Sequence, residues 1–358
     1  MRDEIKIHIA TEDEAKLWDD YVVSHPEATH CHLYCWKKII EESYNQKGYY
    51  FIAKQEGQIV GILPSIHIQS RIFSTSLVSM PYLSYGGILA THQNAAQHLF
   101  TSAFAKAKKL NVNTLELRNR QQCCINYTKD NEQIRKVRMV KTLPSSATEL
   151  SQSFPSKLRS QIKRPVKEGM TFQIGGIELL DSFYDVFTVN MRDLGSPVHR
   201  KSIFCNLMEG LPGQVKIGVV SYRNSAVASG IIISFNDEVE IPWASSLRSY
   251  NKLSPNMLLY YSFLEYCCNR NIKKFDFGRS TPGEGTYRFK KQWGATPEPL
   301  VWKTCPTTHT VNYNELDQHF TKNKKTSKTM DILVEVWKKL PVSVANKLGP
   351  LIRGDISN

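Results

Sequence analysis

The second half of the chain contains an order of elements that few folds accommodate. Apolar spacing predicts two helices, a hairpin, a third strand, a long helix, a strand and a short helix, at residues 154–168, 181–193, 214–235, 238–245, 256–270, 275–277 and from 286. The hairpin strands, 214–222 and 226–235, meet across Arg223-Asn224. An antiparallel meander followed by a helical crossover predicts a mixed α/β sheet covered by helices.

The first half shows a looser version of the same order. Its predicted elements are a strand at 5–9, helices at 12–24 and 36–43, an antiparallel pair at 49–54 and 58–68, a helix at 94–110 and a strand at 114–118. Small polar residues follow Leu143-Pro144 and mark a boundary. A length of 358 residues suits two domains. We therefore expect domains at 1–145 and 146–309, and a basic amphipathic helical tail at 310–358.

The stretch from Phe275 to Gly294 (FDFGRSTPGEGTYRFKKQWG) holds the densest chemistry of the chain. Phe275 and Phe277 alternate with Asp276 as in a half-buried strand, and a proline and two glycines then end it. A basic, aromatic helix is expected from Thr286. Cations near a helix start are unfavourable unless an anion is bound there, so the stretch predicts a phosphate or carboxylate site.

Composition narrows the class of partner. The net charge of +13 favours anionic partners without choosing among nucleic acid, nucleotide-linked substrates and acidic lipid. The sequence lacks an apolar run of the ~20 residues that span a bilayer and has no signal-peptide pattern, so a cytoplasmic location is expected. The eight cysteines form no spaced framework and are expected as free thiols. The segment Thr29–Trp36 has poor spacing for zinc, so no metal site is predicted.

The element order resembles that of an acetyltransferase-like (GNAT) domain, and two such domains in tandem account for both halves. In that fold a glycine-rich loop before the long helix holds acetyl-coenzyme A. The corresponding loop, 247–256, has no glycine, and Pro255 removes one N–H donor. Coenzyme A is therefore not favoured, and no cofactor is expected beyond an acyl donor as co-substrate. Pro255 also suits the first position of a helix.

Several segments together resemble the FemAB family, most closely the branch associated with exosortase (XrtA)/PEP-CTERM systems. The resemblance covers about residues 30 to 303 and rests on PYLSYGG at 81–87, KLRSQIKR at 157–164, RDLGSP at 192–197, PWASS at 242–246, PNMLLY at 255–260 and the stretch from Phe275 to Gly294. It implies tandem acetyltransferase-like domains. In the characterised branch it also implies transfer of an amino acid from aminoacyl-tRNA to an amine of a peptidoglycan precursor; the exosortase-associated branch is linked to exopolysaccharide export.

The resemblance also suggests site residues. Lys290 is the first candidate for catalysis, because the family's lysine there lies beside the aminoacyl ester, where an ammonium binds phosphate or stabilises an oxyanion; a solvated cation is the alternative. Tyr287 and Phe289 match the same pattern. Further substrate contacts are expected from Arg279, Ser245, Ser246, Asn256 and Tyr85. Structural alternatives are an ion pair of Arg279 with Asp276 or Glu284, strand-end capping by the serines, and a core position for Tyr85.

Two residues are candidate bases for the attacking amine, Asp193 and His199. The family reaction also proceeds without a protein base if the substrate carries the proton. The helix at 154–168 holds the densest basic run, and Arg159 and Lys163 are predicted to follow a tRNA backbone; a solvated basic face is the alternative. Pro165 is expected to kink or end that helix after Arg164. Base-specific nucleic-acid reading is not indicated.

The tail favours a helix at 330–340 with Ile332, Leu333, Val336, Trp337 and Leu340 on one side. A tryptophan beside lysines suits the inner face of an anionic membrane, and docking onto the protein's own body is the alternative. The favoured function is a FemAB-like N-acyltransferase that moves an aminoacyl or other acyl group from an activated donor, such as aminoacyl-tRNA, to an amine of an envelope, exopolysaccharide or peptidoglycan-type precursor. The alternatives are a coenzyme A-dependent N-acyltransferase and a non-catalytic relative that binds a precursor or an export partner.

Overall fold

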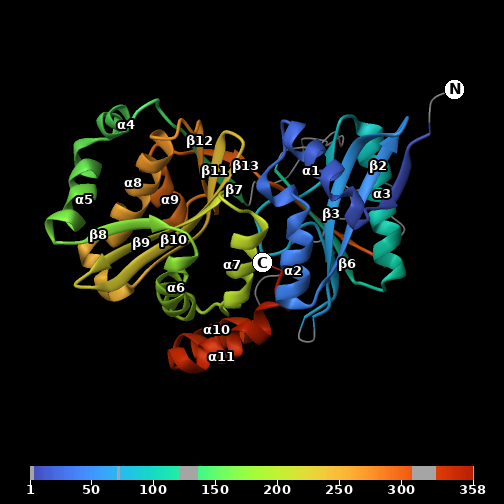
Figure 1. The fold of residues 1–358 in the computed structure, drawn as a ribbon. Helices are drawn as coiled ribbons and strands as arrows, with labels where there is room; N and C mark the ends of the chain where they lie inside the picture. Colours follow the sequence, from blue (N-terminus) through green and yellow to red (C-terminus); the bar gives the residue numbers. More distant parts are fainter. Residues whose placement is uncertain (1–3, 71–72, 121–135, 309–327, 358) are drawn as a thin grey trace. The chain divides into compact units, whose positions relative to one another are not determined.

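The computed structural model describes residues 4–70, 73–120, 136–308 and 328–357. The chain divides into two compact units, and each is built on a mixed sheet (Figure 1). The first unit comprises residues 1–134, 299–325 and 352–358, and the second comprises 135–298 and 326–351. These ranges differ from the predicted 1–145, 146–309 and 310–358. Two strands account for much of the difference, because 137–142 pairs within the second sheet and 301–306 pairs within the first.

The sheet of the first unit has the strand order β1-β2-β3-β4-β6-β14, with β5 paired to β3. Its strands are β1 (Lys6–Ile9), β2 (Lys47–Gln55), β3 (Gln58–Ile68), β4 (Ser76–Val78), β5 (Leu89–Ala90), β6 (Thr114–Asn119) and β14 (Val301–Pro306). The helices are α1 (Ala15–Ser24), α2 (Cys35–Tyr44) and α3 (Gln93–Lys109), with 3-10 turns η1 (Glu12–Glu14) and η2 (His30–His32). The predicted hairpin of β2 and β3 is confirmed, because it depends on local alternation and a tight turn.

The segment Thr29–Trp36 is part of the core of the first unit. The indole nitrogens of Trp18 and Trp36 donate hydrogen bonds to the carbonyls of His32 and His30, at 2.6 and 2.9 Å. His32 accepts a hydrogen bond at Nδ1 from the Thr29 amide, and burial lowers its pKa to about 3. This histidine is therefore a neutral core residue that caps its own turn.

The sheet of the second unit has the order β13-β7-β12-β11-β10-β9-β8. Its strands are β7 (Val137–Thr142), β8 (Thr171–Gly175), β9 (Val215–Tyr222), β10 (Ser225–Phe235), β11 (Glu238–Ser246), β12 (Lys274–Ser280) and β13 (Thr296–Pro299). The helices are α4 (Ala147–Ser153), α5 (Ser156–Lys167), α6 (Leu180–Leu194), α7 (Lys201–Gly210), α8 (Pro255–Cys268) and α9 (Gly285–Lys291), with η3 (Ile177–Leu179) and η4 (Arg248–Leu253). The predicted meander β9-β10-β11 and the crossover through α8 are both present.

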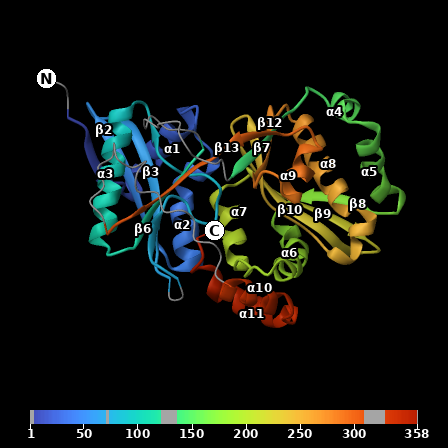
Figure 2. The same ribbon diagram turned by 180° about the vertical axis from the view of Figure 1, so that it is seen from behind.

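Helices cover both faces of this sheet (Figures 1 and 2). A side chain at Gly230 would meet Phe263 of α8, whereas the hydroxyl of the adjacent Ser229 donates to the carbonyl of Phe183 on α6. Because neighbouring strand residues point to opposite faces, α8 packs on one face and α6 on the other. The element order predicted from the sequence therefore gives a three-layer unit.

Strands β11 and β12 separate along their length. They pair in parallel only at residues 238–240 opposite 274–276, although β11 runs on to Ser246 and β12 to Ser280. On its other side, β12 forms a bulge against β7 between Asp276 and Arg279. Gly278 supplies the positive φ of 75° that this bulge requires. The separation leaves a gap in the sheet at the ends of both strands.

Arg138 of β7 anchors β12 from the side opposite to β11. Its guanidinium contacts the carboxylates of Glu238, Asp276 and Glu298 at 2.9, 3.3 and 2.6 Å. Both Arg138 and Asp276 are almost completely buried, and Asp276 also accepts a hydrogen bond from the Gly278 amide at 2.7 Å. A buried arginine with this many acidic partners is a structural element of the sheet.

Of the two expectations for Pro165, a kink or an end of the helix after Arg164, the second is wrong. The helix continues to Lys167 and includes Pro165. Only its last turn follows the proline, so the helix loses one internal hydrogen bond near an end where carbonyls are already unpaired. The proline ring is buried, so it adds apolar packing.

The C-terminal region contains α10 (Lys328–Lys338) and α11 (Val342–Arg353), which begins just after Pro341. Among the described residues, no helix combines the length and hydropathy needed to cross a bilayer.

Candidate functional site

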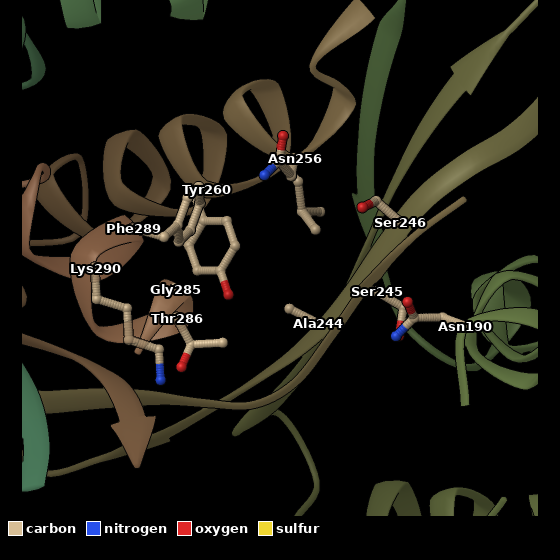
Figure 3. Close-up of a pocket in the computed structure, with 11 residues that line it drawn as sticks. Asn190, Ala244, Ser245, Ser246, Asn256, Tyr260, Gly285, Thr286, Phe289 and Lys290 are labelled. Atoms are coloured by element: carbon tan, nitrogen blue, oxygen red, sulfur yellow. The ribbon is translucent and has the colours of Figure 1, made fainter. Parts of the chain in front are cut away.

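A pocket of about 280 Å³ lies where β11 and β12 separate (Figure 3). All of its lining residues belong to the second unit. They come from α6, the end of β11, the first turns of α8, and α9, namely Asn190, Ala244, Ser245, Ser246, Asn256, Leu259, Tyr260, Gly285, Thr286, Phe289 and Lys290. Five predicted site residues therefore meet at one pocket: Lys290, Ser245, Ser246, Asn256 and Phe289.

Lys290 is a buried cation at one side of this pocket. Its ammonium donates hydrogen bonds to the carbonyls of Gly278 and Arg279, at 3.1 and 2.8 Å. Both carbonyls belong to the part of β12 beyond its pairing with β11. No carboxylate lies within ion-pair distance of Lys290 in the described part of the chain. Burial lowers the pKa of Lys290 to about 8, and the more distant charges of Asp276 and Glu240 offset part of this effect.

Polar groups line the opposite side of the pocket (Figure 3). The amide nitrogen of Asn190 donates to the Ser245 hydroxyl at 3.0 Å. Ser245 is buried, whereas Ser246 and Asn256 are half-buried. A hydroxyl held by an amide in this way is oriented to donate a hydrogen bond to a bound molecule.

Tyr260 forms an aromatic wall between these two sides. Its ring stacks on Phe277 at a centroid distance of 5.7 Å and meets the edge of Phe289 at 5.0 Å. The hydroxyl points into the pocket (Figure 3), and burial raises its pKa well above the ordinary value. Tyr260 is therefore a neutral hydrogen-bond donor throughout the physiological pH range.

The loop before α8 has a geometry of its own. It forms η4, and Ser254 then adopts a left-handed conformation with φ 59°. Pro255 is the first residue of α8, as predicted, and contributes no N–H. The amide of Met257 already donates to the Ser254 carbonyl at 3.0 Å. Two positions of the first helical turn are thus unable to bind a phosphate.

Three predicted site residues are not among those that line the pocket. Asp193 accepts a hydrogen bond from its neighbour Arg192 at 2.7 Å. His199 is buried among aromatic rings that include Phe204 and Trp243. Neither candidate base lines the pocket. Tyr85 belongs to the first unit and is fully buried there, which fits the alternative of a core aromatic residue.

The remaining predicted residues do not line the pocket either. Arg279 is half-buried and holds Lys290 through its main-chain carbonyl. Tyr287 packs against the hydrophobic core of the unit. On α5, Arg159 donates to the carbonyl of Phe154 at 2.6 Å, whereas Lys163 is exposed.

Sequence reasoning missed three pocket residues with polar side chains: Asn190, Tyr260 and Thr286. Asn190 occurs in an amphipathic helix otherwise assigned to packing, and Tyr260 occurs in a helix that is apolar on nearly every side. The only signal for Tyr260 is its place in the PNMLLY segment. Thr286 follows Gly285 at the start of α9 and gives no pattern of its own.

Comparisons with known proteins agree with this architecture. Residues 152–291 match the model of the acetyltransferase (GNAT) domain. The crystal structure of FemX is similar at a TM-score of 0.62 and 14% identity, over 82% of this chain and 95% of FemX. A tandem GNAT protein from the clavulanic acid biosynthesis pathway is similar at a TM-score of 0.55 and 12% identity, over 86% of this chain and 100% of that one.

A third similar structure is the C-terminal domain of a protein described as a lysylphosphatidylglycerol synthetase from Agrobacterium fabrum. Its TM-score is 0.52 at 10% identity, over 81% of this chain and 91% of that domain. The search of curated proteins found no match. At these identities the likeness establishes the fold, and the exosortase-associated branch stays a prediction. The chain has the mixed α/β tandem GNAT fold that it shares with FemX.

Proposed function

We propose that this protein is an N-acyltransferase that moves an aminoacyl or related acyl group from an activated ester to an amine of a cell-envelope or exopolysaccharide precursor. The observation that carries the proposal is Lys290. An ammonium is buried beside a pocket without a carboxylate partner in the described chain, and its two ligands are neutral carbonyls. A buried ammonium with neutral ligands can stabilise a negative charge that forms in the pocket.

The chemical step requires charge stabilisation and one proton transfer. The amine nitrogen attacks the ester carbonyl carbon, and an oxyanion forms. The Lys290 ammonium stabilises that charge in a partly dry site, where such stabilisation is typically worth 10²–10³-fold in rate. The C–O bond of the ester then breaks to give an amide and an alcohol, and the proton from the amine ends on the leaving oxygen. Tyr260 is placed to donate a hydrogen bond to that oxygen.

The loop before α8 supports an ester donor over coenzyme A. A pyrophosphate needs several free N–H groups at the helix start, and Pro255 and Met257 supply none. The fold shared with FemX and the exposed cations of α5 together make aminoacyl-tRNA the donor that we favour. The exposed members of this basic face are Lys157, Lys163, Arg164 and Lys167.

The pocket also suggests how the acceptor is held. Ser245, Ser246 and Asn256 form a polar side opposite Lys290, and the aromatic wall of Tyr260 lies between. This arrangement fits an acceptor whose amine approaches along a hydrogen-bonding edge while its carbon stem lies on the ring.

The test is an amide-transfer assay with the full chain, a mixture of labelled aminoacyl-tRNAs and a nucleotide-linked peptidoglycan precursor with a free amine. We expect transfer of label, and a loss of about 10²–10³-fold for Lys290→Ala. Lys291→Ala is the matched control, because Lys291 is exposed on the same helix. It should keep transfer within about twofold.

Two outcomes would favour the alternatives. Transfer from acetyl-coenzyme A, with micromolar binding by calorimetry, would make the protein a coenzyme A-dependent N-acyltransferase. Precursor binding that persists without transfer from either donor would indicate a non-catalytic relative.

A further inference from the structure

The C-terminal hairpin, defined as residues 331–351 of α10 and α11, is attached to the second unit along one face. Helix α10 packs against α6. The Arg192 guanidinium donates to the Leu340 carbonyl at 2.7 Å, and Arg200 donates to the Pro350 carbonyl at 3.2 Å. Gly195 has a φ of 77°, and a side chain there would collide with Val334 at 2.5 Å. The attachment is therefore close and specific.

The opposite face of the hairpin exposes apolar side chains. Thirteen large hydrophobic residues are exposed in the described chain, and six of them occur within these 21 residues. On α11 they recur at i, i+4 and i+7, which places them on one stripe of the helix. The six, with their exposed fractions, are Ile332 (63%), Leu333 (55%), Val336 (54%), Val344 (38%), Leu348 (42%) and Leu351 (65%).

The structure changes which residues face outward. The sequence suggested Trp337 as the membrane-facing aromatic residue, yet Trp337 and Val334 are half-buried. The two sequence alternatives thus describe different faces of one hairpin. One face docks onto the protein's own body, and the other remains open.

Lysines border the open face. Lys339 lies one turn beyond Val336, and Lys347 lies one turn before Leu351; both lysines are exposed. Glu335 is paired with Lys338 at 2.6 Å, so it does not oppose these cations directly. A shallow apolar stripe with a cationic border has the chemistry that binds an anionic lipid surface.

We infer that the C-terminal hairpin is a peripheral docking site for an anionic bilayer surface. The apolar residues enter the headgroup boundary, and Lys339 and Lys347 contact lipid phosphates. The docking site adjoins the last turn of α6, and Asn190 of the pocket lies five residues before Gly195, about 7.5 Å along that helix. Docking would hold the pocket close to lipid-linked molecules. The inference concerns binding alone and does not depend on the proposed reaction.

The test is flotation of the full chain with vesicles of phosphatidylcholine alone, or with about one third phosphatidylglycerol. We expect binding to the mixed vesicles to be at least about tenfold tighter and to weaken with added salt. Leu348→Ser with Leu351→Ser should weaken binding about tenfold or more. Ile177→Ser is the control, because Ile177 is 54% exposed elsewhere in the same unit.

The charge contribution is tested separately. Lys339→Glu with Lys347→Glu should weaken binding to the mixed vesicles, whereas Lys109→Glu with Lys252→Glu changes the net charge equally and should not. Equal losses for the two pairs would mean non-specific attraction and would overturn the inference. Absence of binding would also overturn it. So would a dimer that forms without lipid and that Leu348→Ser with Leu351→Ser dissociates. All substituted residues are exposed, so circular dichroism and the melting temperature should stay unchanged.

Discussion

Two buried cations meet strand β12, and they have opposite surroundings. Arg138 reaches it from β7 and contacts three carboxylates, including the fully buried Asp276. Lys290 reaches it from α9, and among the described residues its ammonium donates to two main-chain carbonyls. The arginine is neutralised within the protein, whereas the lysine retains charge that its immediate ligands do not neutralise. Burial alone therefore does not distinguish a structural cation from a functional one; the partners do.

The largest effect should come from breaking the arginine site. Arg138→Met leaves Asp276 buried without its cation, so we expect a loss of about 3–5 kcal/mol in the free energy of unfolding. Urea denaturation measures it. Asp276→Asn in the same chain should recover much of the loss, because the amide oxygen still accepts from the Gly278 amide.

A matched pair sets the scale for this result. Lys54 and Glu14 form a 2.7 Å ion pair that is partly exposed, so Lys54→Met should cost about 1 kcal/mol or less. If Arg138→Met cost no more than Lys54→Met, the arginine would not be the anchor of β12.

The lysine site should show its strain as a pH dependence. The folded chain loses the Lys290 proton near pH 8, whereas the unfolded chain keeps it to about 10.5. Between these values the unfolded state binds more protons, so the stability of the wild type rises with pH relative to Lys290→Met, by about 3 kcal/mol in total. Denaturation at several pH values measures the difference. Lys291→Met is the control, because Lys291 is exposed. The difference in the free energy of unfolding between wild type and this variant should not change with pH.

The rate of transfer should depend on the same proton, that of the Lys290 ammonium. Transfer that needs the Lys290 ammonium has a kcat/KM that falls above about pH 8, by about tenfold per pH unit. Lys290→Arg keeps a cation at all these pH values, so its profile should lose the alkaline limb even though its rate is lower. If kcat/KM fell at alkaline pH in both the wild type and Lys290→Arg, the titrating group would not be Lys290.

Local patterns predicted much of the fold. The β9-β10 hairpin and helix α8 were evident because two-residue turns and sustained helical spacing are local. Strands β7 and β14 were not, because their partners lie far along the chain and their roles exist only once both sheets have formed. For the same reason Arg138 gave no signal, since its three carboxylates are 100 or more residues away.

Residues of the candidate site were predicted where a sequence motif marks them. They were missed where only the folded chain brings them to the pocket. Lys290 and Phe289 came from a recognisable stretch, and the structure places both at the pocket. Asp193 and His199 are candidates by residue type, because acidic residues and histidines commonly act as bases, but their side chains are held by Arg192 and by aromatic packing, respectively. Which side of α6 or α8 faces a pocket depends on where β11 and β12 separate, and no helical period encodes that.

The smallest effect that we predict is on the rate of transfer. It distinguishes stabilisation of the oxyanion by Lys290 from hydrogen bonding to the leaving oxygen by Tyr260. Tyr260→Phe removes the hydroxyl that faces the pocket and keeps the ring that packs on Phe277 and Phe289. We expect kcat to fall about tenfold with KM within about twofold, and the loss to shrink with an activated ester whose leaving oxygen needs no hydrogen bond. Tyr261→Phe is the control, since that hydroxyl contacts Glu265 at 3.3 Å. A loss independent of the leaving group would assign the Tyr260 hydroxyl to holding a substrate, and its proposed hydrogen bond to the leaving oxygen would then be wrong.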